Sequence, residues 1–171
     1  SLGDGWAKRL RFFQAADVKA EVAYEFDERK HGPEAVKYYA LRNDTEHGLG
    51  AHPLPEGAWR ALRESGGGAE LAWVGERAEK YLPIGEKMEL FWGSDGLMIV
   101  EPRMTDFERR AVEFDAHGNV TGHDTVETWE IEIRNAGDRA APLRLRRYFS
   151  GDWTAEPLDG APGFRKVDHE T

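Results

Sequence analysis

The chain has 171 residues, of which 40% are hydrophobic and 32% are charged. This is enough apolar material for one ordinary domain, or for two small ones at most. Thirty-two acidic against 23 basic residues give a formal net charge of −9, which would repel a polyanion and argues against nucleic acid as a partner.

The composition excludes several other classes of site. Without cysteine the chain has no disulfide, no thiolate metal site and no thiol nucleophile. No apolar run approaches the roughly 20 residues of a membrane-spanning helix, so we expect no membrane span in this chain, and its start does not resemble a signal peptide. The chain begins at Ser1 rather than at Met, as a segment cut from a longer protein would.

The first strong periodicity, between residues 18 and 27, has a period of two. Even positions are apolar, among them Val22, Tyr24 and Phe26, and charged residues such as Glu25 and Asp27 alternate with them. Because successive side chains of a strand point to opposite faces, this pattern predicts a half-buried strand.

Two later segments give mixed signals. Residues 33–42 and 55–64 both begin at a proline and have apolar residues at helical spacing. Local propensity leaves a short helix and a strand equally open for both. The three glycines at 66–68 that follow are expected to be a loop tip rather than a domain linker.

Two hairpins are predicted further along the chain. Residues 88–92 have apolar side chains at alternate positions, and residues 97–100 are all apolar. The two segments flank a Ser-Asp-Gly turn signal. Residues 129–134 and 143–149 flank an Asn-Ala-Gly-Asp signal in the same way.

Residues 107–114 and the C-terminal residues depart from simple alternation. Residues 107–114 are strand-like, but their apolar set changes face between Ala111 and Val112, which predicts a bulge. Residues 157–171 are rich in turn signals and are expected to form a loop or tail.

About nine strands separated by turn signals predict an all-β fold, namely an antiparallel β-sandwich that forms a single domain over residues 1–171. Trp73, Trp92 and Trp129 are in phase with aliphatic neighbours and are expected in or beside the core. The basic cluster Arg144, Arg146 and Arg147 alternates with leucines, and is expected on a solvated strand face opposite Glu130 and Glu132.

Six short blocks occur in a fixed order: Tyr38-Tyr39-Ala40-Leu41-Arg42-Asn43, Leu49-Gly50-Ala51-His52-Pro53-Leu54-Pro55-Glu56-Gly57, Trp73-Val74-Gly75-Glu76, Arg103-Met104-Thr105-Asp106-Phe107, Trp129-Glu130-Ile131-Glu132-Ile133-Arg134-Asn135 and Ser150-Gly151-Asp152-Trp153. Through these ordered blocks, the chain resembles the C-terminal conserved domain of the mucoidy-inhibitor-like proteins, the DUF4139 family. The resemblance covers about residues 36–171.

The resemblance implies a β-rich domain of a bacterial protein and favours a strand for both ambiguous segments. It implies no established activity, because the family has no agreed catalytic residues. It also implies a further strand after Asp168-His169-Glu170-Thr171, so that the sandwich would lack its last strand and would present an open sheet edge.

Signatures of catalysis are few. The chain has no Gly-x-Ser-x-Gly elbow and no phosphate-binding glycine loop, and its carboxylates are too numerous for a pair to be chosen from the sequence. We therefore expect a non-enzymatic module for assembly or recognition within a larger bacterial protein, in the envelope or periplasm rather than in the cytoplasm. A protein partner or a second copy would bind at the open edge.

Two alternatives remain open. A carbohydrate-binding module would use exposed aromatic rings, with Trp59 and Trp153 as stacking platforms and Asp152 beside the second. A hydrolase would use Asp152, Glu76 or a loop histidine. The simpler interpretation of Trp153 is a chain corner at which the Asp152 carboxylate accepts backbone N–H bonds.

The histidines form two candidate metal pairs. His47 and His52 lie five residues apart, and His117 and His123 lie six apart, each pair with carboxylates nearby. Neither pair has the i,i+4 spacing of a helical zinc motif. We therefore expect no metal and no cofactor, and solvated loop histidines are the simpler interpretation.

Overall fold

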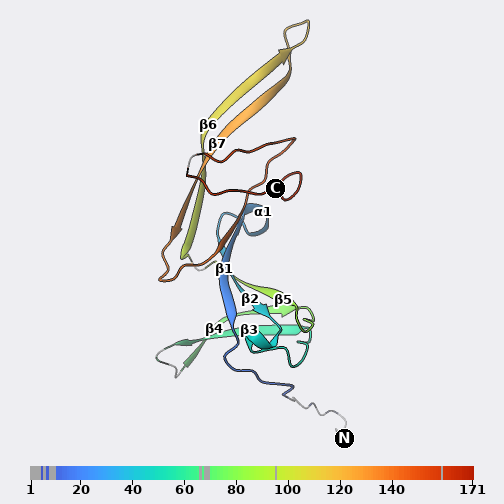
Figure 1. The fold of residues 1–171 in the computed structure, drawn as a ribbon, viewed down its shortest axis with the longest axis vertical. Helices are drawn as coiled ribbons and strands as arrows, with labels where there is room; N and C mark the ends of the chain where they lie inside the picture. The colour runs from blue at the N-terminus through green and yellow to red at the C-terminus, as the bar shows by residue number, and fades with distance from the viewer. Residues whose placement is uncertain are drawn as a thin grey trace. The chain divides into compact units, whose positions relative to one another are not determined.

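The computed structural model describes residues 5, 7, 11–65, 67, 70–94, 96–158 and 160–171. Strands make up 51% of the described residues and helices make up 4%, which confirms the predicted all-β class. In chain order the elements are β1 (Ala20–Asp27), α1 (Glu28–His31), β2 (Val36–Arg42), η1 (Thr45–His47), β3 (Gly57–Ser65), β4 (Glu70–Glu79), β5 (Lys87–Gly93), β6 (Met98–Phe114), β7 (Val120–Asn135) and β8 (Leu143–Arg146) (Figure 1).

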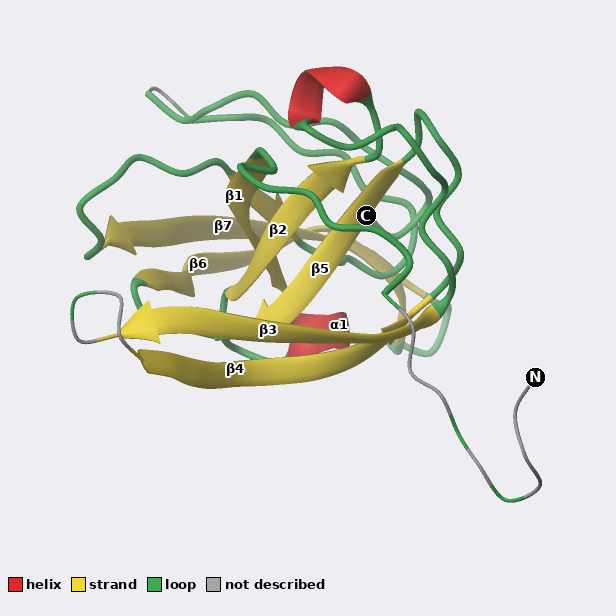
Figure 2. Ribbon diagram, turned by 90° about the horizontal axis from the view of Figure 1, so that it is seen from below, coloured by secondary structure: helices red, strands yellow, loops and turns green. Residues whose placement is uncertain are grey.

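The eight strands of the described residues form three sheets. One sheet has the order β5-β2-β1-β8, while β3–β4 and β6–β7 are two-stranded antiparallel ribbons (Figure 2). The finer prediction of a nine-stranded antiparallel sandwich is not confirmed, and the pairing of β8 with β1 is parallel. The missing last strand stays a prediction.

The chain divides into two compact units. The first consists of Ser1–Ala23 and Tyr38–Trp92, and the second of Tyr24–Lys37 and Gly93–Thr171. Each unit has an apolar cluster of its own. The single domain over residues 1–171 stays a prediction.

In the first unit, the core lies between the β2–β5 pair and one end of the β3–β4 ribbon. Its buried residues are Leu54, Leu82, Met88 and Leu90, and half-buried Tyr39, Leu41, Leu49, Trp59 and Trp92 pack against them. A Cβ added at Gly75 of β4 would come within 3.3 Å of the Trp92 ring, so the ribbon and the indole are in close contact. The expected position of Trp92 beside the core is confirmed.

One buried side chain, Asn43, holds the loops of this unit together. Its Nδ2 donates to the carbonyl oxygens of His52 (3.1 Å), Leu82 (3.3 Å) and Pro83 (3.1 Å). Its Oδ1 accepts from the backbone N–H of Gly50 at 2.9 Å. Gly50 has a φ of +86°, and a Cβ there would come within 2.7 Å of backbone, so the loop requires glycine at this position.

The core of the second unit lies between the paired strands β1 and β8 and one end of the β6–β7 ribbon. Tyr24 and Phe26 of β1 are in register with Leu143 and Leu145 of β8. These side chains share one cluster with residues of the ribbon and of nearby loops: Met98, Val100, Ile131, Ala35 and Ala141. The apolar half of the period-two pattern thus faces a core, as predicted for residues 18–27.

The β6–β7 ribbon is long and irregular along β6. Its register shifts between Met104 and Asp106, and again between Arg110 and Glu113. Within the second shift Ala111 has a φ of +48°, which is uncommon for a residue other than glycine. The bulge predicted at Ala111 is therefore confirmed.

Both predicted hairpins are wrong, because their strands pair with other strands. β5 pairs with β2 and β6 pairs with β7, while β8 pairs with β1. The turn after β7 does exist, since Asn135 Oδ1 accepts from the Gly137 N–H at 2.9 Å. A turn sequence reverses the chain locally, but it does not determine which strand becomes the partner. Asp95 of the other turn, and Gly66 and Gly68 of the predicted loop tip, lie outside the described residues.

The two ambiguous segments form the strands β2 and β3, as the family resemblance favours. The helical segments of the described residues are α1 and η1, which were not predicted. Each follows an aspartate whose Oδ1 accepts a backbone N–H: Asp27 from Lys30 at 3.1 Å, and Asp44 from His47 at 3.0 Å. Such N-cap bonds stabilise a single turn without an apolar period.

The Asn43 contacts predict a specific loss of stability. Asn43→Ala removes the partner of the His52 carbonyl and of the Gly50 N–H, and it removes one of the two donors to each of the Leu82 and Pro83 carbonyls. We expect it to lower the free energy of unfolding by about 2–4 kcal/mol. Urea unfolding measures this difference. Asn119→Ala, in an exposed turn, is the control and should cost less than about 1 kcal/mol. Equal losses in the two variants would contradict the role of Asn43.

Candidate functional site

The first predicted histidine pair has separate local partners. His47 Nδ1 lies 2.6 Å from Asp44 Oδ1, and the backbone N–H of His47 donates to the same oxygen. The hydrogen bond from His47 lowers the pKa of Asp44. The ring of His52 lies 5.6 Å from that of Phe12 and 6.4 Å from that of Phe13. These histidines therefore stabilise a turn and an aromatic contact.

The second pair lies in and beside the β6–β7 turn. Asp115 accepts backbone N–H bonds from His117 and Asn119 at 2.8 Å, and Asn119 Nδ2 donates to it at 2.9 Å. The Asn119 side chain is the main reason why the pKa of Asp115 is lowered. His123 is exposed on β7. Over the ranges that the structure describes, no three His, Asp or Glu side chains gather into a metal site.

The two candidate stacking tryptophans are both used in packing. Trp59 packs on the core of the first unit. Trp153 is half-buried: its Nε1 donates to the carbonyl oxygen of His169 at 2.7 Å, its ring centroid lies 5.0 Å from that of Phe149, and Lys166 Nζ lies 4.3 Å from the ring. Trp153 thus holds residues of the C-terminal segment against the loop after β8.

The candidate carboxylates, Asp152 and Glu76, have different surroundings. Asp152 is exposed. Glu76 lies on β4, where its Oε2 is 2.5 Å from Arg60 Nε across the ribbon. The contact of Glu76 is that of a cross-strand surface pair.

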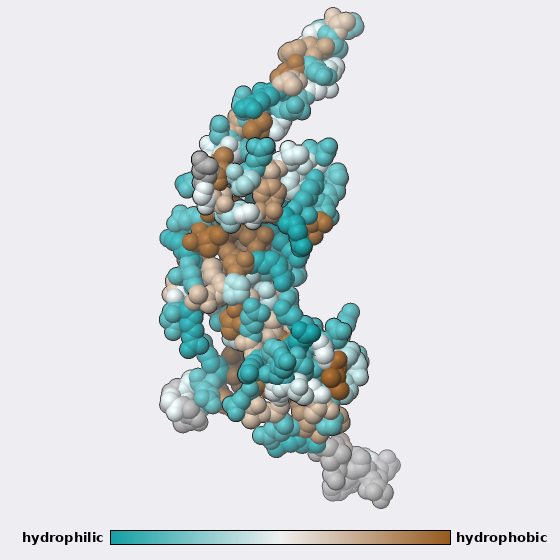
Figure 3. Space-filling view, viewed as in Figure 1, coloured by the Kyte–Doolittle hydropathy of each residue, from teal (hydrophilic) through white to brown (hydrophobic). Residues whose placement is uncertain are grey.

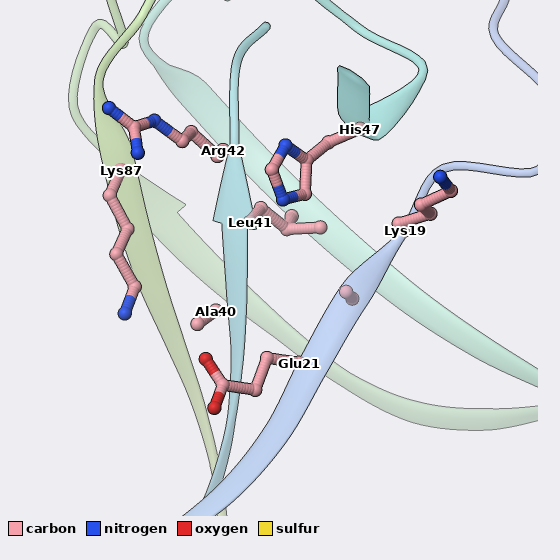
Figure 4. Close-up of a pocket in the computed structure, with 8 residues that line it drawn as sticks. Lys19, Glu21, Ala40, Leu41, Arg42, His47 and Lys87 are labelled. Atoms are coloured by element: carbon pink, nitrogen blue, oxygen red, sulfur yellow. The ribbon is translucent and has the colours of Figure 1, made fainter.

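A shallow hollow of about 390 Å³ lies on the first unit, lined by Lys19, Ala20, Glu21, Ala40, Leu41, Arg42, His47 and Lys87 (Figure 4). The amino groups of Lys19 and Lys87 point in opposite directions. Arg42 Nε lies 3.3 Å from Asp44 Oδ2 and donates to the Gly85 carbonyl at 3.2 Å. The cationic groups of this hollow therefore diverge or have anionic partners, rather than converging on a ligand.

Two buried carboxylates on β1 were not predicted. Glu25 and Asp27 are each only 1% exposed, although the alternating pattern placed them in solvent. They lie on the face of β1 opposite Tyr24 and Phe26, so the second half of this strand is buried on both faces. A buried carboxylate is costly unless cations or hydrogen-bond donors replace its water.

Four basic groups surround Glu25. Lys30 Nζ and His31 Nε2 of α1 lie 3.3 and 3.6 Å from its Oε2. Arg146 Nε and Arg144 Nη1 of β8 lie 3.7 and 4.0 Å from its Oε1. We call Glu25, Asp27 and these four basic residues the acid–base layer.

Asp27 completes this layer with hydrogen bonds. Its Oδ2 accepts from the Tyr148 hydroxyl at 2.8 Å and lies 3.9 Å from Arg146 Nη1, while its Oδ1 caps α1. The hydrogen bond to Asp27, supported by burial, raises the pKa of Tyr148.

The arginines of β8 are therefore not on a solvated face opposite Glu130 and Glu132, as predicted. The parallel register places Arg144 beside Glu25 and Arg146 beside Asp27. Arg147 lies over the Trp129 ring at 4.3 Å and pairs with Glu28. The matching spacing of Glu25-x-Asp27 and Arg144-x-Arg146 was the available signal in the sequence.

Trp73 is 58% exposed, which makes its predicted core position wrong. It pairs with Leu62 across the β3–β4 ribbon, and Leu71, two residues earlier on β4, lies on the same face. Leu62 is 52% and Leu71 is 64% exposed. The core covers only the end of the ribbon near Trp59, so the apolar pattern continues past the element that could bury it.

The β6–β7 ribbon also exposes large apolar side chains. Its exposed set is Met104, Phe107, Val112, Phe114, Val120, Val126 and Ile133. Figure 3 shows hydrophobic groups at intervals along this ribbon, between hydrophilic ones. Trp129 is half-buried and lies beneath Arg147, and its expected position beside the core stays a prediction.

Comparisons of the chain with protein-family models, with curated proteins and with solved structures find no match. The resemblance to the DUF4139 family stays a prediction. In the described part of the chain, no helix is both long and apolar enough to cross a membrane.

The acid–base layer predicts the effect of removing one charge. Glu25→Gln keeps the side-chain volume but leaves Arg144, Arg146 and Lys30 without their central anion. We expect a loss of about 1–3 kcal/mol in the free energy of unfolding at pH 7, because these cations are partly hydrated. Glu21→Gln, an exposed change on the same strand, should stay within about 0.5 kcal/mol. Guanidinium unfolding of both variants checks this, and a fully stable Glu25→Gln protein would refute it.

The raised pKa of Tyr148 predicts a dependence on alkaline pH. A group whose pKa is raised by folding stabilises the protein below its unfolded value, and this contribution is lost as the pH rises through the folded value. Tyr148→Phe should therefore be about 1 kcal/mol less stable than the wild type at pH 8, and the difference should shrink above pH 10. Unfolding curves at both pH values measure it; a difference that stays constant would show that the phenol does not bond to Asp27.

Proposed function

We propose that this protein is a non-enzymatic β-rich module that binds another polypeptide through its two-stranded ribbons, as part of a larger bacterial protein. The observation that carries the proposal is the group of large apolar side chains exposed on one face of β3–β4, namely Leu62, Leu71 and Trp73, with further exposed apolar side chains spaced along β6–β7. A two-stranded ribbon is marginally stable in water by itself, and exposed apolar side chains add no stability to it. Grouped apolar exposure of this kind marks interaction surfaces.

Trp73 is the best anchor for such an interaction. Its indole is the largest exposed side chain of the β3–β4 ribbon, and Leu62 and Leu71 flank it on one face. Exposed tryptophans surrounded by aliphatic residues are typical centres of binding energy in protein interfaces.

The polar groups support a structural rather than a catalytic use. Asp27, Asp44 and Asp115 accept N–H bonds that cap short turns. Glu25 is enclosed by cations, and Glu76 pairs across a ribbon. Each of these carboxylates contributes to folding where it lies.

The family and the location are part of the same proposal. The six ordered sequence blocks support a relation to the DUF4139 family. Through that resemblance we propose the bacterial envelope or periplasm as the location.

Site-specific cross-linking tests the proposal. A photo-reactive amino acid at position 71, in the native host, should give a protein adduct on illumination. Adding Trp73→Ser should lower the adduct yield at least tenfold, because loss of an anchor residue costs about 2 kcal/mol or more of binding free energy. The same probe at Glu56, an exposed loop position, is the control.

Adducts that are equal at positions 71 and 56, or that do not depend on Trp73, would contradict a specific interface. Turnover of a generic ester, phosphate or glycoside substrate that one point mutation abolishes would contradict the non-enzymatic assignment.

A further inference from the structure

We infer that the outer edge of β7, between Thr125 and Asn135, accepts an extended polypeptide segment in which aliphatic residues alternate with lysine or arginine. The inference rests on the proposed function and names the partner class for the β6–β7 ribbon. Four observations carry it: the regular edge of β7, the apolar face of that edge, its acidic face, and the net charge of the ribbon.

The edge of β7 is open and regular within the described residues. β7 pairs with β6 alone in its sheet. From Thr125 to Asn135 its Cα partners on β6 follow in sequence apart from one shift, and there the extra residue, Thr105, belongs to β6. β6 has the second shift as well, at Ala111. Bulges blunt a strand edge against further pairing, so β7 is the better edge for an added strand.

One face of this edge is apolar. Ile131 packs against the core of the second unit, Trp129 is half-buried, and Ile133 is 50% exposed. All three point to the same face, because they are spaced by two. A strand added along β7 would place every second side chain beside them and would extend this core outward.

The other face is acidic. Glu132 lies directly opposite Glu101 of β6, a like-charge pair. Arg134 lies 3.1 Å from Glu101 and 3.3 Å from Glu132, and Arg103 lies 2.8 Å from Glu130. Two arginines thus form ion pairs with three carboxylates, which leaves this face with a net negative charge. A basic side chain from an added strand would lie next to Glu130 and Glu132.

The charge of the whole ribbon selects the partner. Residues 98–135 have nine acidic and four basic side chains, which gives a net charge of −5 with neutral histidines. Two such ribbons would repel each other, so a second copy of this chain is disfavoured at the edge. A basic segment would be attracted, and its association would weaken with salt.

Peptide binding tests the inference. Three capped peptides of about nine residues, long enough for one strand, alternate valine with lysine, with serine or with glutamate. We expect the lysine peptide to bind at least tenfold more tightly than the serine peptide at low salt, and the glutamate peptide not to bind. Methylation of alternate amide nitrogens in the lysine peptide should abolish binding to the unaltered protein, because strand addition requires those N–H groups.

A matched pair of variants locates the site. Glu130→Gln/Glu132→Gln should weaken binding of the lysine peptide at least fivefold. Asp106→Asn/Glu113→Gln removes the same charge from β6 and should change binding less than twofold. Unfolding curves of both variants confirm that they fold, and the methylated peptide provides a test without any variant.

Three outcomes would overturn the inference: equal binding of the lysine and serine peptides, equal effects of the two double variants, or dimerisation of the free protein through this edge in sedimentation experiments. The proposed function is tested separately. If the peptides fail to bind while Trp73-dependent adducts form at position 71, the β7 inference is wrong and the proposed function stands. If the lysine peptide binds and those adducts do not form, the β7 edge stands and the Trp73 anchor is wrong.

Discussion

The burial of Glu25 and Asp27 on one face of β1 is the constraint on which the second unit depends. Buried carboxylates must be paired with cations or hydrogen-bond donors, and β8 supplies Arg144 and Arg146 in register with them. The alternate residues of β8, Leu143 and Leu145, face the apolar core. Charge on one face and hydrophobicity on the other therefore specify the same parallel register, since a slip of one residue would place leucine beside the carboxylates.

The two units share one arrangement, in which a sheet covers one end of a two-stranded ribbon and leaves the rest exposed. In the first unit the core ends near Trp59, and the apolar residues around Trp73 lie outside it. In the second unit the core includes Val100 and Ile131, while the ribbon continues to Phe114. Cores that end before their ribbons do are the physical basis for proposing that these ribbons bind other polypeptides.

Local alternation was enough to predict the strands at β1, β6 and β7 and the bulge at Ala111, because the period of a strand is a property of neighbouring residues. Pairing was predicted wrongly, because the turn signals suggested partners for β5 and β8 that the sheets do not have. Alternation also shows which residues share a face but not what covers that face. For this reason the acid–base layer was missed and Trp73 was wrongly placed in the core.

Amide exchange along β7 tests the central claim, an open recognition edge, most directly. In an antiparallel pair alternate residues direct their N–H groups toward the partner strand. Residue-resolved hydrogen exchange of the free protein is therefore predicted to alternate between slow and fast from Thr125 to Asn135. Slow exchange at consecutive residues of this run would mean that another segment already covers the edge, and would contradict the account.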